Sequence, residues 1–244
     1  MFTLVPSSRR RRSGRTRPAS LWWWAGSAST RSRRWTPSTS FRRRSRSPSR
    51  HMGRSSTGWR NRRARGHETL LQAPMEPFDY PRNNPGPHML TTDAADGGGD
   101  DLLWLMSRFA GYAGVMNYLG GRFTADETAM SSALGEISRR GLFYLDDGAS
   151  PQSRAAAVAQ RLGAPFGQVD VILDDAPQAM DAALAKLETL ARDKGAAIGF
   201  ANASPAAVAR IARFSKALER RGLALAPVSS ALAPRGAAAG DGRK

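Results

Sequence analysis

Carboxylates follow several apolar segments in the second part of the chain, each where a strand would end. Glu76 stands in the string PMEP after an apolar run, Asp146 and Asp147 close the run LFYL, and Asp174 follows DVIL. Ionised carboxylates act as general bases, nucleophiles or metal ligands when a fold gathers them. We therefore select Glu76, Asp146 and Asp174 as candidate catalytic residues. The alternative for Asp146 and Asp147 is structural, since aspartates also favour turns and helix caps.

Neutral and cationic polar side chains occur at neighbouring positions and suit ligand binding. Asn117 and Arg122 come at and after the end of a predicted strand, where a site of a β/α protein would lie. The guanidinium of Arg122 suits a carboxylate or phosphate on a ligand. Tyr80 and Asp79 lie in a Pro-rich loop that suits one wall of a sugar groove, or is plain loop structure. We select Tyr80, Asn117 and Arg122 as candidate substrate-binding residues.

The histidines form no recognisable metal motif. His88 has no second ligand at a metal-site spacing, and His67 precedes a strand, where a turn or surface position is the simpler interpretation. Cysteine is absent, which excludes disulfides and thiolate metal sites. No phosphate-binding glycine loop and no serine nucleophile elbow is present.

Apolar runs alternate with amphipathic runs from residue 68 onward, which predicts the elements that position these residues. The predicted strands cover residues 68–74, 114–118, 142–146, 168–174, 196–201 and 223–228. The predicted helices cover residues 100–112, 125–140, 151–162, 177–194 and 205–221, with Thr124 and Ser204 as helix caps. This alternation indicates an α/β fold with a largely parallel sheet, either a barrel or an open sheet.

The N-terminal quarter has a different composition. Residues 1–66 contain 19 arginines and no Asp, Glu or Lys, and the rest of the chain holds 18 Lys+Arg against 20 Asp+Glu. The net charge of +17 therefore belongs to this segment. We expect residues 1–65 to be disordered, because they cannot bury enough apolar surface to offset chain entropy. Arginine runs beside tryptophans also suit nucleic acid, and an acidic membrane surface is a further possibility.

A shifted reading frame accounts for this composition. Codons compatible with residues 22–29 (WWWAGSAS), read from one base earlier, are able to encode VVVGGLGI. The same shift over residues 36–53 is able to give DAIDKLPAAVTLAFAPYG. Both strings have the pattern of buried strands with turns. We favour this hypothesis over a genuine basic arm.

The chain resembles the divergent polysaccharide deacetylase family over residues 66–230. The resemblance is carried by GHETLLQAPMEPFDYP (66–81), NPGP (84–87), VMNYLGGRFTA (115–125), LFYLDDGASPQSRA (142–155), DVILD (170–174), AIGFANASPAAVARIA (197–212) and RGLALAPVS (221–229). It implies a distorted β/α barrel, here lacking its first strands, and hydrolysis of acetyl groups on glycans with a divalent metal such as zinc. The two histidines of the family's His-x-x-x-His correspond here to Gln72 and Glu76, and another family histidine corresponds to Tyr118. Gln72 is therefore added to the substrate-binding candidates, and no metal ligand is assigned.

The resulting prediction is a deacetylase-like protein of carbohydrate metabolism, inactive or impaired as translated, with a glycan as its ligand. The alternatives are a non-catalytic glycan-binding or scaffold protein of the envelope and, in another class, a nucleic-acid-binding protein. The resemblance implies a periplasmic or envelope location, and no apolar run is long enough for a membrane span. We expect one domain over residues 66–230 and a flexible tail over residues 231–244.

Overall fold

The computed structural model describes residues 2–6, 67–93, 98–174 and 176–232. The strands are β1 (Phe2–Pro6), β2 (Leu70–Met75), β3 (Gly114–Leu119), β4 (Phe143–Asp146), β5 (Phe166–Gln168), β6 (Val171–Leu173), β7 (Ala197–Ala201) and β8 (Leu223–Ala226). The helices are α3 (Gly99–Met106), α4 (Gly121–Ala125), α5 (Glu127–Arg139), α6 (Ala155–Leu162), α7 (Pro177–Lys194) and α8 (Pro205–Leu218), with short 3-10 turns at Glu219–Arg221 and Val228–Ala231.

The strands form two four-stranded sheets that meet between β5 and β6. One sheet has the order β2-β3-β4-β5 and is parallel, and the other has the order β6-β7-β1-β8. The chain passes from one to the other at Val169, which donates to Asp146 O, and Asp170, which donates to Ile198 O. The predicted α/β fold with a largely parallel sheet is thus confirmed, and its arrangement is consistent with a distorted barrel. The predicted strand 168–174 is divided at this crossing.

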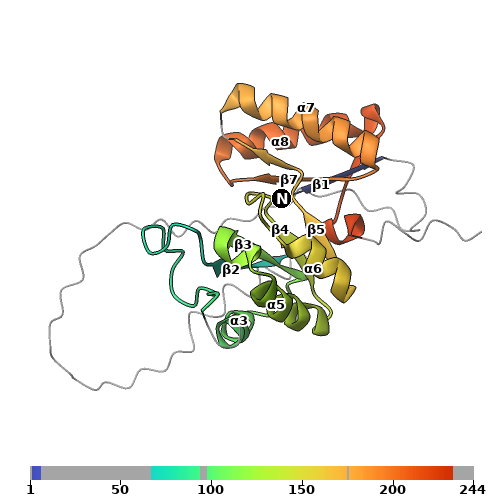
Figure 1. Ribbon diagram of the computed structural model, residues 1–244. Coiled ribbons are helices and arrows are strands. Elements are labelled where there is room, and N and C mark those ends of the chain that lie inside the picture. The colour runs from blue at the N-terminus through green and yellow to red at the C-terminus, as the bar shows by residue number, and fades with distance from the viewer. Residues whose placement is uncertain (1, 7–66, 94–97, 175, 233–244) are drawn as a thin grey trace, which may run out of the picture.

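Helices cover the outside of both sheets, and a separate apolar layer lies between the sheets. In Figure 1 the strands lie between α7 and α8 on one side and α3, α5 and α6 on the other. Two outer clusters pack against these helices, one around β2, β3 and β4 and one around β6, β7 and β8. The inner cluster joins residues of both sheets: Met116, Phe143, Leu145, Val169, Ile198 and Val228. An inner cluster with residues from both sheets is what the interior of a barrel requires.

β1 was not predicted from the sequence. It lies antiparallel between β7 and β8, with Leu4 opposite both Ala197 and Leu225. Thr3 and Leu4 are fully buried. The five residues precede the first arginine and carry the β-favouring Thr and Val, so they pair on both sides although the following segment is unsuited to a core. The predicted disorder therefore does not hold for residues 2–6, and residues 7–66 lie outside the described residues.

Two helix predictions need correction. The helix predicted over residues 100–112 ends at Met106, and Phe109 packs against the core from beyond its end. Thr124 does not cap the following helix, because its Oγ1 donates to Gly120 O within α4. The cap is Asp126, which accepts from Ala129 N at 2.8 Å. Ser204 caps α8 as predicted, by accepting from Ala207 N.

None of the helices in the described ranges is long and apolar enough to cross a membrane.

Candidate functional site

Glu76, the first residue beyond β2, is a buried carboxylate bound by two other segments. It is 2% exposed, and its Oε1 lies 3.0 Å from Arg122 Nη1. Its Oε2 accepts from Thr92 N at 2.9 Å and from Thr92 Oγ1 at 3.0 Å. Its backbone oxygen accepts from the amides of Arg122 and Phe123, both at 3.1 Å. Glu76 therefore connects the end of β2 to α4 and to the loop at residue 92.

Arg122 is the half-exposed partner in this arrangement. Its Nη2 lies 3.7 Å from Asp93 Oδ1, so two carboxylates surround one guanidinium. A buried carboxylate needs such a partner, because an isolated ion in a low-dielectric interior is strongly disfavoured. In this structure its guanidinium binds carboxylates of the protein itself.

Asp146, at the end of β4, stabilises the loop that follows it. The carboxylate is 2% exposed; Oδ1 accepts from Gly148 N at 2.7 Å and Oδ2 accepts from Ser153 Oγ at 2.6 Å. Both oxygens thus serve the connection between β4 and α6. This geometry matches the structural alternative for Asp146, a turn-forming aspartate.

Asp147 has a different environment from its neighbour. Its amide donates to Asn117 Oδ1 at 2.9 Å, and its own Oδ1 accepts from Ala149 N at 2.9 Å. Burial raises the pKa of the Asp147 carboxyl, the negative charge of Asp146 adds to the rise, and the hydrogen bonds from Ala149 and Asn117 oppose it. Asn117 is buried and its Nδ2 donates to Leu119 O, so it connects β3 to the β4 loop.

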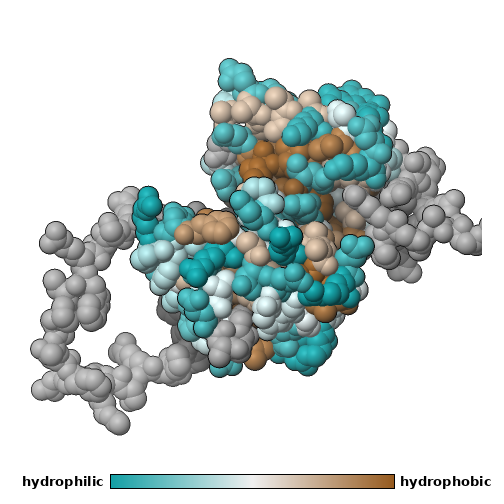
Figure 2. Space-filling model, viewed as in Figure 1, coloured by the Kyte–Doolittle hydropathy of each residue, from teal (hydrophilic) through white to brown (hydrophobic). Residues whose placement is uncertain are grey.

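A cavity of about 450 Å³ lies beside Asp147. Its lining includes Asp147, the half-exposed Ile172 of β6, and Ala183 and Lys186 of α7. The volume falls within the range of small-ligand sites. Figure 2 shows that hydrophobic side chains gather on the part of the molecule that carries α7 and β7. Asp170 also lines this cavity, but its oxygens are bonded to Lys194 Nζ at 3.0 Å and Ile198 N at 2.9 Å.

The remaining candidates lie outside the group formed by Glu76, Arg122 and Thr92. Asp174 is exposed after β6 and its Oδ1 accepts from Ala176 N at 3.2 Å. Gln72 lies in the middle of β2, opposite Met116 of the inner layer. Because a strand rises roughly 3.3 Å per residue, Gln72 lies about 13 Å from Glu76 along β2. Tyr80 is exposed in the loop after β2.

The contacts of His88 are with Trp104 and Asp101 rather than with these carboxylates. His88 stacks on Trp104, with ring centroids 3.5 Å apart, and its Nδ1 lies 2.8 Å from Asp101 Oδ1. His67 precedes β2 and is partly buried. A histidine ring that is stacked and paired with one carboxylate does not resemble a metal site.

Sequence reasoning did not select two exposed aromatic residues at the strand ends, Phe78 and Tyr118, as candidates. Phe78 is 61% exposed after β2, and Tyr118 is 47% exposed near the end of β3. Phe78 is the first aromatic residue of the loop string PFDYP, which is the signal that marks it in the sequence. Phe78 lies in the same loop as the candidate Tyr80, and Tyr118 follows the candidate Asn117 directly.

The donor set does not fit a divalent metal. Among the described residues, no group of three His, Cys, Asp or Glu side chains is placed to hold a metal ion. The carboxylate oxygens of Glu76 and Asp146 already accept hydrogen bonds from other residues of the protein. Gln72 is a poor zinc ligand and lies in the middle of β2, away from Glu76 at the strand end.

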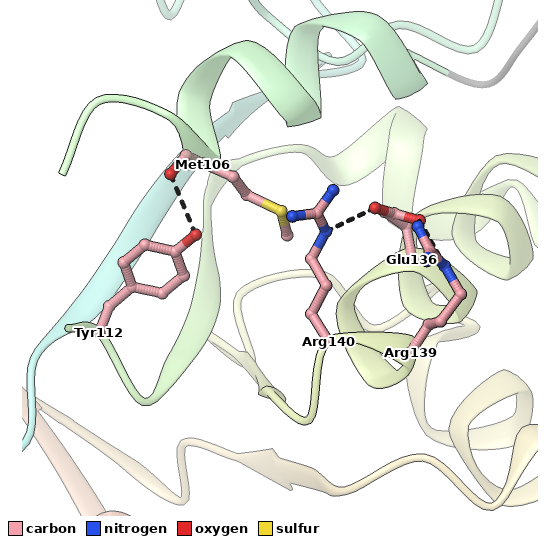
Figure 3. A network of polar contacts seen from close by, with 5 residues as sticks. All are labelled: Met106, Tyr112, Glu136, Arg139 and Arg140. Carbon is pink, nitrogen blue, oxygen red and sulfur yellow. Dashed lines mark hydrogen bonds and ion pairs between the residues drawn. The ribbon is translucent and has the colours of Figure 1, made fainter. Parts of the chain in front are cut away.

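Another polar network, on α5, is structural. Glu136 accepts from Arg139 Nη2 at 2.6 Å and from Arg140 Nε at 2.5 Å, all on the surface of one helix and its C-terminus (Figure 3). Tyr112 donates to Met106 O at 3.2 Å beside this group. Burial raises the pKa of Tyr112, and the charge of Arg140 opposes the rise.

Comparisons with known proteins identify the family. The divergent polysaccharide deacetylase family matches residues 51–232, so the match begins fifteen residues before the expected boundary at residue 66. The crystal structure of an uncharacterized protein from Agrobacterium tumefaciens is similar, with 42% sequence identity, a TM-score of 0.68, and coverage of 70% of this chain and 71% of that one. A search of curated proteins found no match. Since the family match spans most of the chain and the fold agrees, this protein belongs to the divergent polysaccharide deacetylase family.

Proposed function

We propose that the chain is a deacetylase-like carbohydrate protein that binds a glycan at its strand ends and does not carry out metal-dependent deacetylation. The observation that carries this proposal is the internal bonding of Glu76 by Arg122 and Thr92. The glycan follows from the family, whose name refers to acetylated polysaccharides. An envelope location, as expected from the resemblance, is part of the same proposal.

The chemistry of acetyl hydrolysis explains why this bonding matters. A catalytic metal needs three protein ligands and an open position, where it polarises the acetyl carbonyl and lowers the pKa of an attacking water. Glu76 would have to give up two hydrogen bonds and its ion pair to become such a ligand. Leaving Arg122 and Thr92 without that partner costs free energy that a single oxygen ligand offsets poorly.

Asp147 supports a second candidate function, hydrolysis without a metal. Its pKa is raised, and it faces the cavity of about 450 Å³. A carboxyl group with a raised pKa next to a cavity is a candidate general acid or base. In this alternative Asp147 moves a proton and Asn117 fixes the loop that carries it.

Two measurements on the full chain separate these functions. Calorimetric titration with Zn²⁺ is expected to show no saturable binding, and incubation with a chitin oligosaccharide in EDTA is expected to release no acetate. Saturable zinc binding, with acetate release that depends on zinc, contradicts the proposal. Acetate release in EDTA that is lost in Asp147→Asn supports the metal-free hydrolase instead.

A further inference from the structure

The exposed aromatic residues of the described chain are concentrated at the ends of β2 and β3. In the described ranges, four aromatic side chains are exposed: Phe78, Tyr80, Tyr118 and Trp104. Trp104 stacks on His88, and the guanidinium of Arg108 lies over its ring. The other three lie in or next to the segments that follow β2 and β3. Exposed rings in the segments at the ends of two paired strands indicate a candidate binding face.

Phe78 is placed by a close approach to a glycine. A Cβ at Gly121 would lie 2.9 Å from Cδ2 and 3.0 Å from Cε2 of the Phe78 ring, so the ring occupies the space that any side chain at this position would take. Gly121 is the first residue of α4, and the next residue is Arg122. The ring thus packs against the residue that precedes Arg122 in α4, while it remains 61% exposed.

The backbone between β3 and α4 makes this approach possible. Gly120 has φ +92, and a Cβ there would lie 2.6 Å from Cβ of Met75. Leu119 is opposite Met75 in the sheet register. Gly120 and Gly121 therefore allow the start of α4 to pack against the end of β2, and the Phe78 ring packs against Gly121.

The groups around Phe78 match the two faces of a sugar ring. A pyranose presents an apolar face of C–H groups, which packs against the negative face of an aromatic ring. Its edge carries hydroxyls, which need both donors and acceptors. Arg122, 49% exposed, follows Gly121 in α4, and its ion-pair partner Asp93 is 81% exposed, so this pair offers donors and acceptors to a ligand. Because Arg122 is balanced by Glu76 and Asp93, a neutral sugar fits this place better than an anionic one.

We propose that Phe78, held over Gly121, is the stacking platform for a neutral pyranose unit of the glycan, with Arg122 and Asp93 binding its hydroxyls and Tyr80 and Tyr118 extending the face. This inference rests on the proposed function, because it names the sugar-binding residues of the same strand-end site.

The test measures binding of a neutral chitin oligosaccharide to the full chain and its variants. Phe78→Ala is expected to weaken binding about tenfold or more, and Phe78→Tyr, which keeps the flat ring, to change it less than about twofold. Gly121→Ala is expected to weaken binding about fivefold by displacing the ring, although alanine at a helical position does not harm the fold. Leu162→Ala removes another exposed apolar side chain, on α6, and is expected to change nothing.

Each contrary result has its own meaning. If the wild-type chain binds no neutral glycan, the proposed function itself fails. If it binds, but Phe78→Ala and Gly121→Ala bind equally well, only the platform is contradicted. Loss of binding in Ile172→Ala alone would assign the sugar to the cavity beside Asp147 and overturn the inference. Preference for an oligogalacturonate over the neutral probe would overturn the assignment of a neutral sugar.

Discussion

Glu76 holds three segments of the chain together through one buried carboxylate. Its partners Arg122 and Thr92 come from α4 and from the loop after residue 90. Glu76→Ala is expected to lower the free energy of unfolding by about 3 kcal/mol, since the donors that remain are left without their acceptor. Denaturant titration measures this loss.

A matched control is available in the same cluster. Asp93 also faces Arg122, but it is exposed, and exposed ion pairs contribute little. Asp93→Ala is therefore expected to change stability by less than about 0.5 kcal/mol. Equal losses of unfolding free energy in the two variants would contradict the conclusion that Glu76 holds the three segments together.

The sequence located these residues but not their roles. Glu76 and Asp146 stand at strand ends as predicted, because strand ends can be identified from apolar runs and their boundaries. Their partners could not be predicted in the same way. Thr92 lies sixteen residues from Glu76, and only the folded loop places it there. Burial of Asp146 and the position of Asp147 at the cavity likewise depend on the fold of the β4 loop.

At the scale of elements, α5 carries an acid-sensitive contact. Hydrogen bonds from Arg139 and then Arg140 hold the pKa of Glu136 below its ordinary value of 4.5. A lowered folded-state pKa stabilises the fold at pH above 4.5 and ceases to do so as the pH falls through the folded value. Glu136→Gln is expected to reduce stability at pH 7 by only about 0.5 kcal/mol, since both arginine side chains are exposed to solvent.

The pH dependence checks this contact. The difference in unfolding free energy between wild type and Glu136→Gln is expected to shrink as the pH falls below 4.5, where the wild-type carboxylate becomes protonated. A difference that stays constant down to pH 3, or that grows, would show that the arginine contacts do not stabilise the helix.

Most elements could be predicted from the sequence because each has strong local signals. The 177–194 helix has Pro at its start and Gly195 after its end, and the structure agrees at both ends. The cap at Asp126 was missed because Thr124 and Asp126 both lie shortly before Glu127, and both residue types can cap a helix. Only the short helix α4 shows that Thr124 is not the cap, since its hydroxyl donates to Gly120 O and Asp126 accepts from Ala129 N. The division between β5 and β6 depends on Val169 and Asp170 bonding to different sheets, which no local pattern indicates.

For the whole molecule, the least expected feature is the use of β1 as an inner strand of the second sheet. Leu4 is fully buried in the cluster beneath α7 and α8. Thr3 is equally buried, and its Oγ1 has no hydrogen-bond partner among the described residues. Leu4→Ala is expected to destabilise the fold by about 3 kcal/mol, and Thr3→Val to stabilise it by about 1 kcal/mol, because it removes an unsatisfied hydroxyl.

Thermal unfolding of these two variants tests whether β1 belongs to the fold. If neither changes the midpoint, β1 does not occupy its place between β7 and β8 in solution. Among the described residues, β2, β5, β6 and β8 each pair with one strand, and Leu90 bridges β2 at Met75, so sheet edges remain unpaired by a strand. Open edges promote association, and low solubility of the chain as translated is expected.

The shifted-frame hypothesis for residues 1–65 is a separate proposal about the gene. Sequencing the coding DNA through codon 70 tests it. An open neighbouring frame that encodes VVVGGLG and VTLAFAPYG supports the hypothesis. Stops in that frame would instead make the arginine-rich segment genuine, and salt-sensitive binding of DNA would then be the next question.

The most direct test of the central claim is the affinity for a chitin oligosaccharide after treatment with EDTA, measured by calorimetry on the full chain. The proposal that this family member binds glycan through its strand-end residues without a metal predicts the same affinity before and after EDTA, and no change on adding Zn²⁺. Loss of binding in EDTA with recovery on adding Zn²⁺ would contradict it, because the carboxylates assigned here to structural contacts would then have to hold a metal.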